Sequence, residues 1–287
     1  MQLVLDIGNT RNKAALYDKG RMLKCWPQPS DVALPTDVLQ SPIESLVWAS
    51  VRQDQHTNDL VSTFLGQLQQ QDNQAIVSFG IDQQTAVPFD NQYGTPMTLG
   101  IDRIAIVAAV HQLQRQVARQ VPPTAALIID LGTCITTDLL TAEGAYVGGS
   151  ISPGWQMRLD AMHQLTARLP ALRHHNNATS YQNKSSLTDV IDTESQSATD
   201  QARSLLNLPP VLGDSTANCM FSAAFWGIVY ELNGYISHYQ QRYNQLEVFV
   251  SGGDSPTFAP LLAAQVSVNQ HLVLDGLNQI YLFNQRA

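Results

Sequence analysis

The chain has 287 residues, of which 44% are hydrophobic and 14% are charged, and its formal net charge is −8. This length allows a buried core in about two domains. The acidic balance, with a pI near 5.2, argues against a nucleic-acid partner, because nucleic acids favour a basic face. The start of the sequence lacks the basic segment of a signal peptide, and no apolar run approaches the roughly 20 residues that span a bilayer. We therefore expect a cytoplasmic protein with no membrane partner.

The cysteines give no reason to revise that expectation. Cys25, Cys134 and Cys219 are odd in number and far apart, so they match neither a disulfide framework nor a metal-binding C-x-x-C pair.

Two stretches of the chain repeat the same order of strands and turns. Strands are predicted over residues 3–5, 13–17 and 22–26, and again over 126–129, 135–140 and 146–150. Turns are predicted at 18–20 and 142–144, where glycine ends each one. Each copy begins with an apolar triplet that leads into Asp-x-Gly, Asp6 to Gly8 in the first and Asp130 to Gly132 in the second. The repeat predicts an α/β protein with two similar halves.

The remaining elements are predicted from apolar runs and helical periodicity. They are a strand over 46–50, helices over 58–70, 104–117 and 217–239, a strand over 246–250, and a short strand or helix over 279–284. Pro122 and Pro123 end the second helix just before the repeated Asp strand. We therefore expect one domain over 1–121 and another over 122–287, with a polar surface excursion at about 174–204.

The two Asp-x-Gly turns have the composition of phosphate-binding turns. A buried strand delivers a carboxylate to its end, and glycine lets the backbone approach a phosphate. Lys13 follows the first turn on the next strand, where its cation could reach a phosphate oxygen. Asp130 would need a cation between itself and a phosphate, although an aspartate there could also simply cap the turn. Asp138 is expected to satisfy backbone groups of the second hairpin.

A third concentration of polar residues runs from Tyr93 to Arg103. Gly100 permits a tight turn, and Asp102 and Arg103 would open the helix over 104–117. Asp102 could be a helix cap, or the base that accepts a hydroxyl proton during phosphoryl transfer. Arg103 could hold a substrate carboxylate in a two-pronged contact.

Other candidate positions carry weaker signals. His163, His174 and His175 lack a third ligand at metal spacing and are expected in the core or at the surface. The loop over 252–254, Gly-Gly-Asp, suits either a nucleoside contact or an ordinary turn.

Six motifs appear in an order that resembles the type III pantothenate kinases, which carry out the first step of coenzyme A synthesis. The resemblance runs from the first strand to about Ser255 and is sparse over 171–212. The motifs are Asp6-x-Gly-Asn-Thr with Lys13, Gly100-x-Asp-Arg, Asp130-x-Gly-Thr, Gly148-Gly-x-Ile-x-Pro-Gly, Thr166-Ala-x-Leu-Pro and Gly252-Gly-Asp.

This resemblance implies an actin-like α/β fold of two ribonuclease-H-like domains with mixed sheets, and a homodimer. It implies ATP-dependent phosphorylation of pantothenate, with Asp102 as the proton acceptor. It assigns Asp130 to a monovalent cation, potassium or ammonium, while Mg²⁺ accompanies ATP. The implied ATP-binding residues are Asp6, Ile7, Gly8, Asn9, Thr10, Arg11, Asn12, Lys13 and Thr133. The implied pantothenate-binding residues are Tyr93, Gly100, Ile101, Asp102, Arg103 and Thr216.

Two departures from the family pattern affect the alignment of Thr216. The stretch between Pro170 and Gly213 is longer than the usual connection, and the helix after Thr216 carries Phe221-Ser-Ala-Ala where the family has glycine. Two alternatives stay open: an accessory transcriptional regulator of the same family, and another small-molecule kinase of the same fold. The presence of Asp102 and of both phosphate turns favours an enzyme.

Overall fold

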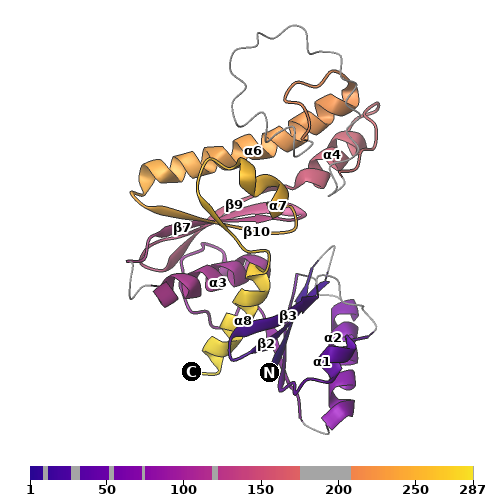
Figure 1. Ribbon diagram of the computed structural model, residues 1–287, viewed down its shortest axis with the longest axis vertical. Helices are drawn as coiled ribbons and strands as arrows, with labels where there is room; N and C mark the ends of the chain where they lie inside the picture. The colour runs from indigo at the N-terminus through magenta and orange to yellow at the C-terminus, as the bar shows by residue number, and fades with distance from the viewer. Residues whose placement is uncertain are drawn as a thin grey trace.

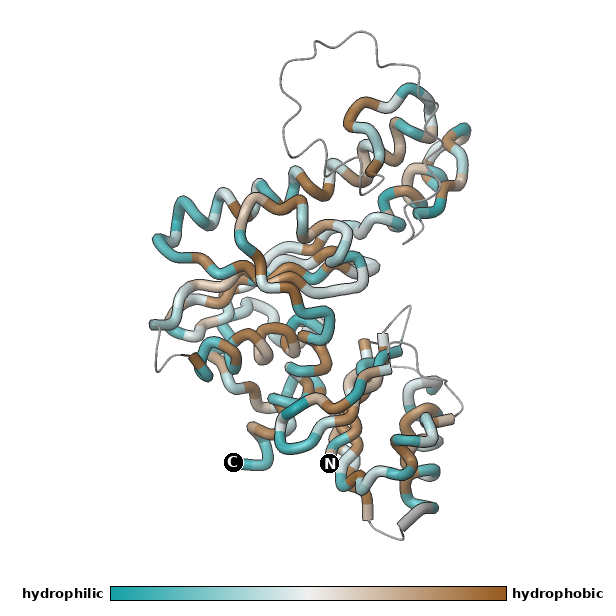
Figure 2. The backbone as a smooth tube through the Cα atoms, in the orientation of Figure 1, coloured by the Kyte–Doolittle hydropathy of each residue, from teal (hydrophilic) through white to brown (hydrophobic). Residues whose placement is uncertain are grey.

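Two mixed β-sheets lie one above the other, and two helices pack between them (Figure 1). The computed structural model describes residues 1–8, 12–26, 33–51, 55–72, 75–117, 122–174 and 208–286. Figure 2 shows that the brown, apolar parts of the chain gather in the strands and on the inner sides of the helices.

The first sheet has the strand order β3-β2-β1-β4-β5, in which β2 runs antiparallel to β1 and β4 runs parallel to it. Its strands are β1 (Gln2–Ile7), β2 (Asn12–Asp18), β3 (Arg21–Trp26), β4 (Ser45–Ser50) and β5 (Val77–Ile81). Helices α1 (Thr36–Leu39) and α2 (Gln55–Asp72) belong to this half, and α2 covers the outer face of the sheet.

The second sheet has the order β11-β10-β7-β8-β9-β6. Its strands are β6 (Asp90–Asn91), β7 (Ala125–Leu131), β8 (Cys134–Leu140), β9 (Ala145–Pro153), β10 (Leu246–Ser251) and β11 (Val266–Val268). Apart from the short edge strand β6, this order repeats that of the first sheet, with two antiparallel pairs followed by two parallel pairs. The predicted duplication and the predicted α/β fold with mixed sheets are confirmed.

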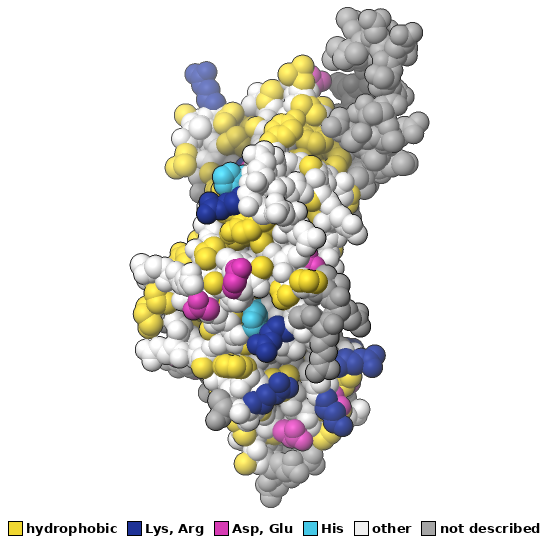
Figure 3. Space-filling view, turned by 90° about the vertical axis from the view of Figure 1, so that its left-hand side faces the viewer, with side chains coloured by type: hydrophobic (Ala, Val, Ile, Leu, Met, Phe, Trp, Pro, Cys, Tyr) yellow, Lys and Arg dark blue, Asp and Glu magenta, His cyan; other side chains and the backbone are white. Residues whose placement is uncertain are grey.

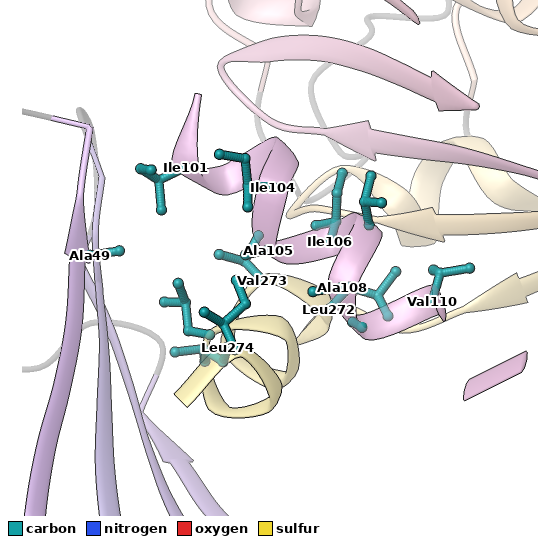
Figure 4. Close-up of a cluster of buried hydrophobic side chains, with 14 of the residues drawn as sticks. Ala49, Ile101, Ile104, Ala105, Ile106, Ala108, Val110, Leu272, Val273 and Leu274 are labelled. Atoms are coloured by element: carbon teal, nitrogen blue, oxygen red, sulfur yellow. The ribbon is translucent and has the colours of Figure 1, made fainter. Parts of the chain in front are cut away.

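Helices α3 (Ile101–Val117) and α8 (Leu272–Asn284) form the layer between the sheets, and α4 (Trp155–Gln164), α6 (Thr216–Arg242) and α7 (Ser255–Phe258) cover the other face of the second sheet (Figure 1). Short 3₁₀ turns, η1 (Pro96–Thr98) and η2 (Ala259–Leu261), join these elements. Figure 4 shows the apolar side chains of α3 and α8 pointing toward one another, with Ala49 of the first sheet nearby. Within the described residues, no helix combines the length and apolar character of a membrane span.

Alternation along the strands decides which side chains face this central layer. On β1, Val4 packs into the central core, whereas Leu3 and Leu5 pack toward α2. On β7, Ala126 and Ile128 face the central core, and the residues between them face α4 and α6. The central layer therefore receives the even-numbered residues of both strands.

The predicted elements are found, with longer bounds. The element predicted over 279–284 is a helix that begins at Leu272, because its apolar periodicity includes residues upstream of the predicted segment. The helix predicted over 104–117 begins at Ile101. Strands β5, β6 and β11 and helices α1, α4 and α7 were not predicted.

The domain division at residue 121 stays a prediction. Two elements pack against the half of the chain on the other side of this division. Helix α8 packs on strands of the first sheet, and β6, from before the division, pairs with β9 of the second. The polar excursion was expected at about 174–204, and all of it except residue 174 lies outside the described residues.

Figure 3 shows one face of the molecule, on which acidic and basic side chains lie among separate apolar patches.

Candidate active site

Asp6 and Asp130 stand at the ends of β1 and β7, and both face the layer between the sheets. Each carboxylate has the same parity along its strand as the residues that pack into the central core, Val4 on β1 and Ile128 on β7. The duplicated motif therefore presents two acidic side chains from opposite sheets toward one region.

Lys13 balances part of this negative charge. It lies directly across from Asp6 in the antiparallel pairing of β1 with β2, where facing side chains are neighbours. Burial raises the pKa of Asp6 to about 6, the charge of Lys13 opposes the rise, and the carboxylates of Asp102 and Asp130 add to it. The ammonium group of Lys13 therefore offsets only part of the negative charge that gathers here.

Asp130 has the same electrostatic setting. Burial raises its pKa to about 6, Lys13 opposes this, and Asp102 and Asp138 reinforce it. Ser251, its register partner on β10, donates a hydrogen bond that favours the charged form. A carboxylate so placed gains from any cation that binds beside it.

The turn that follows Asp130 is supported by two other glycine motifs. At Gly252, where φ is 90°, a Cβ would lie 2.2 Å from the carbonyl oxygen of Leu131. At Gly154 a Cβ would lie 2.5 Å from the carbonyl oxygen of Thr133, and the Gly154 N–H donates to that oxygen at 3.1 Å. Asp254 N–H donates to the Leu131 carbonyl at 3.1 Å. These glycines let two loops close onto the turn that follows Asp130.

Asp102 lies in the first turn of α3, and its carboxylate folds back over Gly100. Its Oδ1 accepts a hydrogen bond from the N–H of Arg103 at 3.0 Å. A Cβ at Gly100 would lie 2.3 Å from that same Oδ1. Glycine at position 100 is therefore required for this placement of the Asp102 carboxylate, because any side chain there would displace it.

Arg103 is buried and its guanidinium binds Asp138 on β8. Arg103 Nε donates to Asp138 Oδ1 at 2.9 Å, and Nη2 lies 2.7 Å from the same oxygen. The hydroxyl of Tyr146 donates to this oxygen as well, at 2.7 Å. The expectation that Asp138 satisfies hairpin backbone groups is wrong, because its even position on β8 turns it toward α3. Tyr146 carried no signal in the sequence.

The remaining predicted residues lie in several different places. Ile7, Gly8 and Asn12 flank the first turn, and Asn9, Thr10 and Arg11 lie outside the described residues. Thr133 is exposed at the second turn, and Tyr93 is half-buried with its ring centroid 5.5 Å from Arg103 Cζ. Ile101 is buried in the central core.

Thr216 is not brought to this cluster. It is the first residue of α6, on the face of the second sheet opposite α3, and it lines an open cavity of about 690 Å³ with Met162, Leu169 and neighbours from 213 to 220. Figure 1 shows α6 and α3 on opposite sides of this sheet.

The carboxylates alone do not make a metal site. In the described part of the chain, no three His, Cys, Asp or Glu side chains gather closely enough to hold an ion. The donor set of Asp6, Asp130 and Asp102 fits hard cations that take oxygen ligands, provided that phosphate oxygens complete the coordination.

Proteins with similar sequences share one family name. A family model described as type III pantothenate kinase matches residues 2–238. A protein of Phocaeicola vulgatus named type III pantothenate kinase is 33% identical over alignments that cover 100% of both chains. One of the same name from Flavobacterium johnsoniae is 30% identical, with 99% of this chain and 98% of that protein covered.

A solved structure from Campylobacter jejuni, described as a Baf family transcriptional activator, has a TM-score of 0.50 and 17% identity, and covers 99% of this chain and 100% of that one. That likeness concerns the fold alone. The family model and the two full-length relatives establish the conclusion: the chain belongs to the type III pantothenate kinase family.

Proposed function

We propose that the cluster of Asp6, Lys13, Asp102 and Asp130 is the site at which this pantothenate kinase transfers the γ-phosphoryl group of ATP to pantothenate. The observation that carries the proposal is their convergence. The four side chains come from three motifs, at the ends of β1 and β7, on β2 and at the start of α3, and they lie within electrostatic reach of one another.

The reaction breaks the bond between the γ-phosphorus and the oxygen of ADP, and forms a bond to the primary hydroxyl oxygen of pantothenate. Asp102 takes the hydroxyl proton, and its fixed place over Gly100 holds the accepting oxygen ready. Lys13 and the N–H groups of the two glycine turns stabilise negative charge on the phosphate oxygens. The product is 4′-phosphopantothenate, the first intermediate on the way to coenzyme A.

Cations complete the charge balance. The kinase uses ATP with a divalent metal, which neutralises phosphate charge in such transfers. We further infer a monovalent cation, potassium or ammonium, at Asp130. Lys13 offsets part of the Asp130 charge and is shared with Asp6. Without a further cation, the Asp130 carboxylate would repel the phosphates of the nucleotide.

A homodimer would explain the place of Thr216. The resemblance assigns this residue to pantothenate, yet the second sheet separates it from Asp102 within one chain. A contact with the same substrate would then come from a second copy. Sedimentation of the purified chain tests this inference, and a monomer that is fully active at assay concentration would contradict it.

The decisive assay measures ADP release with and without pantothenate, with Mg²⁺ present, in potassium and in sodium buffers. We expect turnover that depends on pantothenate and is higher with potassium. Equal turnover in sodium would contradict the monovalent site without affecting the kinase assignment. Turnover only with another hydroxyl substrate would favour a different small-molecule kinase, and absence of any turnover would favour the regulatory alternative.

A further inference from the structure

The buried ion pair between α3 and the second sheet has no role in the phosphoryl transfer described above. Arg103 is 4% exposed and Asp138 is 0% exposed. Burying two charges is costly, and an apolar pair of similar size is often as stable. A contribution to the stability of the fold is therefore a weak explanation for the presence of this ion pair.

The pair fixes the direction of the Arg103 side chain. Asp138 Oδ1 receives the Nε edge of the guanidinium and the hydroxyl of Tyr146. The ring of Tyr146 in turn stacks on the ring of Tyr93, with centroids 5.9 Å apart and planes 17° apart. Arg103 Cζ also lies over the ring of Tyr93, 5.5 Å from its centroid. Arg103 is thus held on one side by Asp138 and directed toward Tyr93 on the other.

This arrangement leaves N–H groups of the guanidinium available. Arginine carries five N–H donors. The Nε N–H binds Asp138, whereas Nη2, although 2.7 Å from the same oxygen, is buried without a hydrogen-bond partner. Burial lowers the pKa of Arg103 and Asp138 raises it, with a net rise, so the guanidinium stays charged. A charged donor beside Tyr93 suits the single carboxylate of pantothenate.

We propose that Asp138 is a positioning residue for substrate selection, which holds Arg103 in the orientation that binds the carboxylate of pantothenate. Tyr146 supports Asp138 in this role. The inference rests on the proposed function, because it assigns the partner of Arg103 within that same site.

A double-mutant cycle tests the proposal. The variants are Asp138→Asn, Arg103→Met and the two combined, and the readouts are KM for pantothenate, KM for ATP and kcat. We expect Asp138→Asn to raise the pantothenate KM about ten- to a hundredfold, as for loss of a hydrogen bond to a charged group. The double variant should match Arg103→Met, because Asp138 acts only through Arg103. The KM for ATP should be unchanged.

A second variant keeps the test valid if Asp138→Asn does not fold. Tyr146→Phe removes one donor to Asp138 and retains the stacked ring, and it should raise the pantothenate KM by a smaller factor. Tyr17→Phe is the matched control, because Tyr17 is also buried and its hydroxyl donates to Asp275 at the same 2.7 Å. It should lower the melting temperature without changing the pantothenate KM.

The outcomes separate the inference from the function on which it rests. Wild-type chain that does not phosphorylate pantothenate refutes the proposed function. If the wild type is active, two results refute the positioning role. One is a double variant whose rise in pantothenate KM equals the product of the two single rises. The other is a folded Asp138→Asn or Tyr146→Phe variant with an unchanged pantothenate KM. Equal rises in both KM values would also refute it, since a general disturbance of the site would produce them.

Discussion

Gly276 on α8 lies directly against the backbone of Ala105 on α3, where a Cβ would come within 1.8 Å of the Ala105 carbonyl oxygen. A backbone atom cannot move aside as a flexible side chain can. The two helices that join the halves of the molecule therefore approach each other as closely as glycine alone permits.

Gly276→Ala should destabilise the chain by about 1–3 kcal/mol, because α3 and α8 must separate to admit the methyl group. Gly234→Ala is the matched control, since it lies in helix α6 with no neighbour within 4 Å of a new Cβ. It should stabilise by about 0.5–1 kcal/mol through helix propensity. Thermal unfolding of both variants checks the pair, and an unchanged melting temperature for Gly276→Ala would contradict the close approach.

Asp102→Asn should lower kcat by roughly 10²–10⁴-fold, because the amide has nearly the size of the carboxylate but cannot accept the hydroxyl proton. Steady-state kinetics with saturating ATP and pantothenate provide the measurement. A folded Asp102→Asn chain with near-wild-type kcat would rule out the base assignment.

Gly100→Ala should reduce kcat with the fold retained. The added methyl group meets only the movable Oδ1 of Asp102, so the carboxylate must leave its place while the backbone need not shift. Gly94→Ala, in the same segment and with nothing within 4 Å, is the control and should leave kcat unchanged. Equal kcat values for the two variants would show that the carboxylate does not need its position over Gly100.

The stability of the ligand-free chain should fall as pH rises from about 4 to 6. Burial raises the pKa of Asp6 and of Asp130 from 3.8 to about 6, so the folded chain binds more protons than the unfolded chain in this interval. Both carboxylates then destabilise the folded chain at pH 7. Asp130→Asn should therefore raise the melting temperature at pH 7, and less at pH 5.

A control of opposite sign is available in Asp37. A hydrogen bond from Lys24 lowers its pKa, so the Asp37 carboxylate favours the folded chain once ionised. Asp37→Asn should lower the melting temperature slightly at pH 7. Calorimetry at both pH values measures the two variants, and a lower melting temperature for Asp130→Asn at pH 7 would contradict the electrostatic account of the site.

Arg103→Lys should raise the pantothenate KM by a factor that corresponds to about 1–3 kcal/mol, because an ammonium cannot reproduce the two-sided contacts of the guanidinium. The ATP KM should stay nearly constant, because we propose that the turns near Asp6 and Asp130, and not Arg103, bind the phosphates. If the variant weakens ATP and spares pantothenate, Arg103 belongs to the nucleotide site.

Local patterns predicted much of this molecule from its sequence. Alternating apolar strands and the two Asp-x-Gly turns gave the paired sheets and the places of Asp6 and Asp130, because strand periodicity and turn chemistry act over a few residues. Lys13 followed from its place on the next strand. Strand β5 was missed because the exposed residues at its start, such as Val77, obscure a buried-strand pattern.

Contacts between distant segments could not be predicted in the same way. The partner of Asp138 lies 35 residues away on another element, and nothing near Asp138 in the sequence distinguishes an ion pair from a hairpin contact. The supporting roles of Gly154 and Gly252 depend on loops that meet only after the second sheet has formed.

Because a chain is synthesised from its N-terminus, the first sheet is made long before α8, the helix that covers one of its faces. Val4 and Val47, on strands made at the outset, share a core with Leu274 and Leu277, which emerge more than 200 residues later. Until then one face of the first sheet lacks its covering helix. A nascent chain must hold that apolar surface exposed, or shielded by other proteins, while the entire second sheet is translated. Slow translation through the second half would lengthen the interval in which the incomplete first half can aggregate.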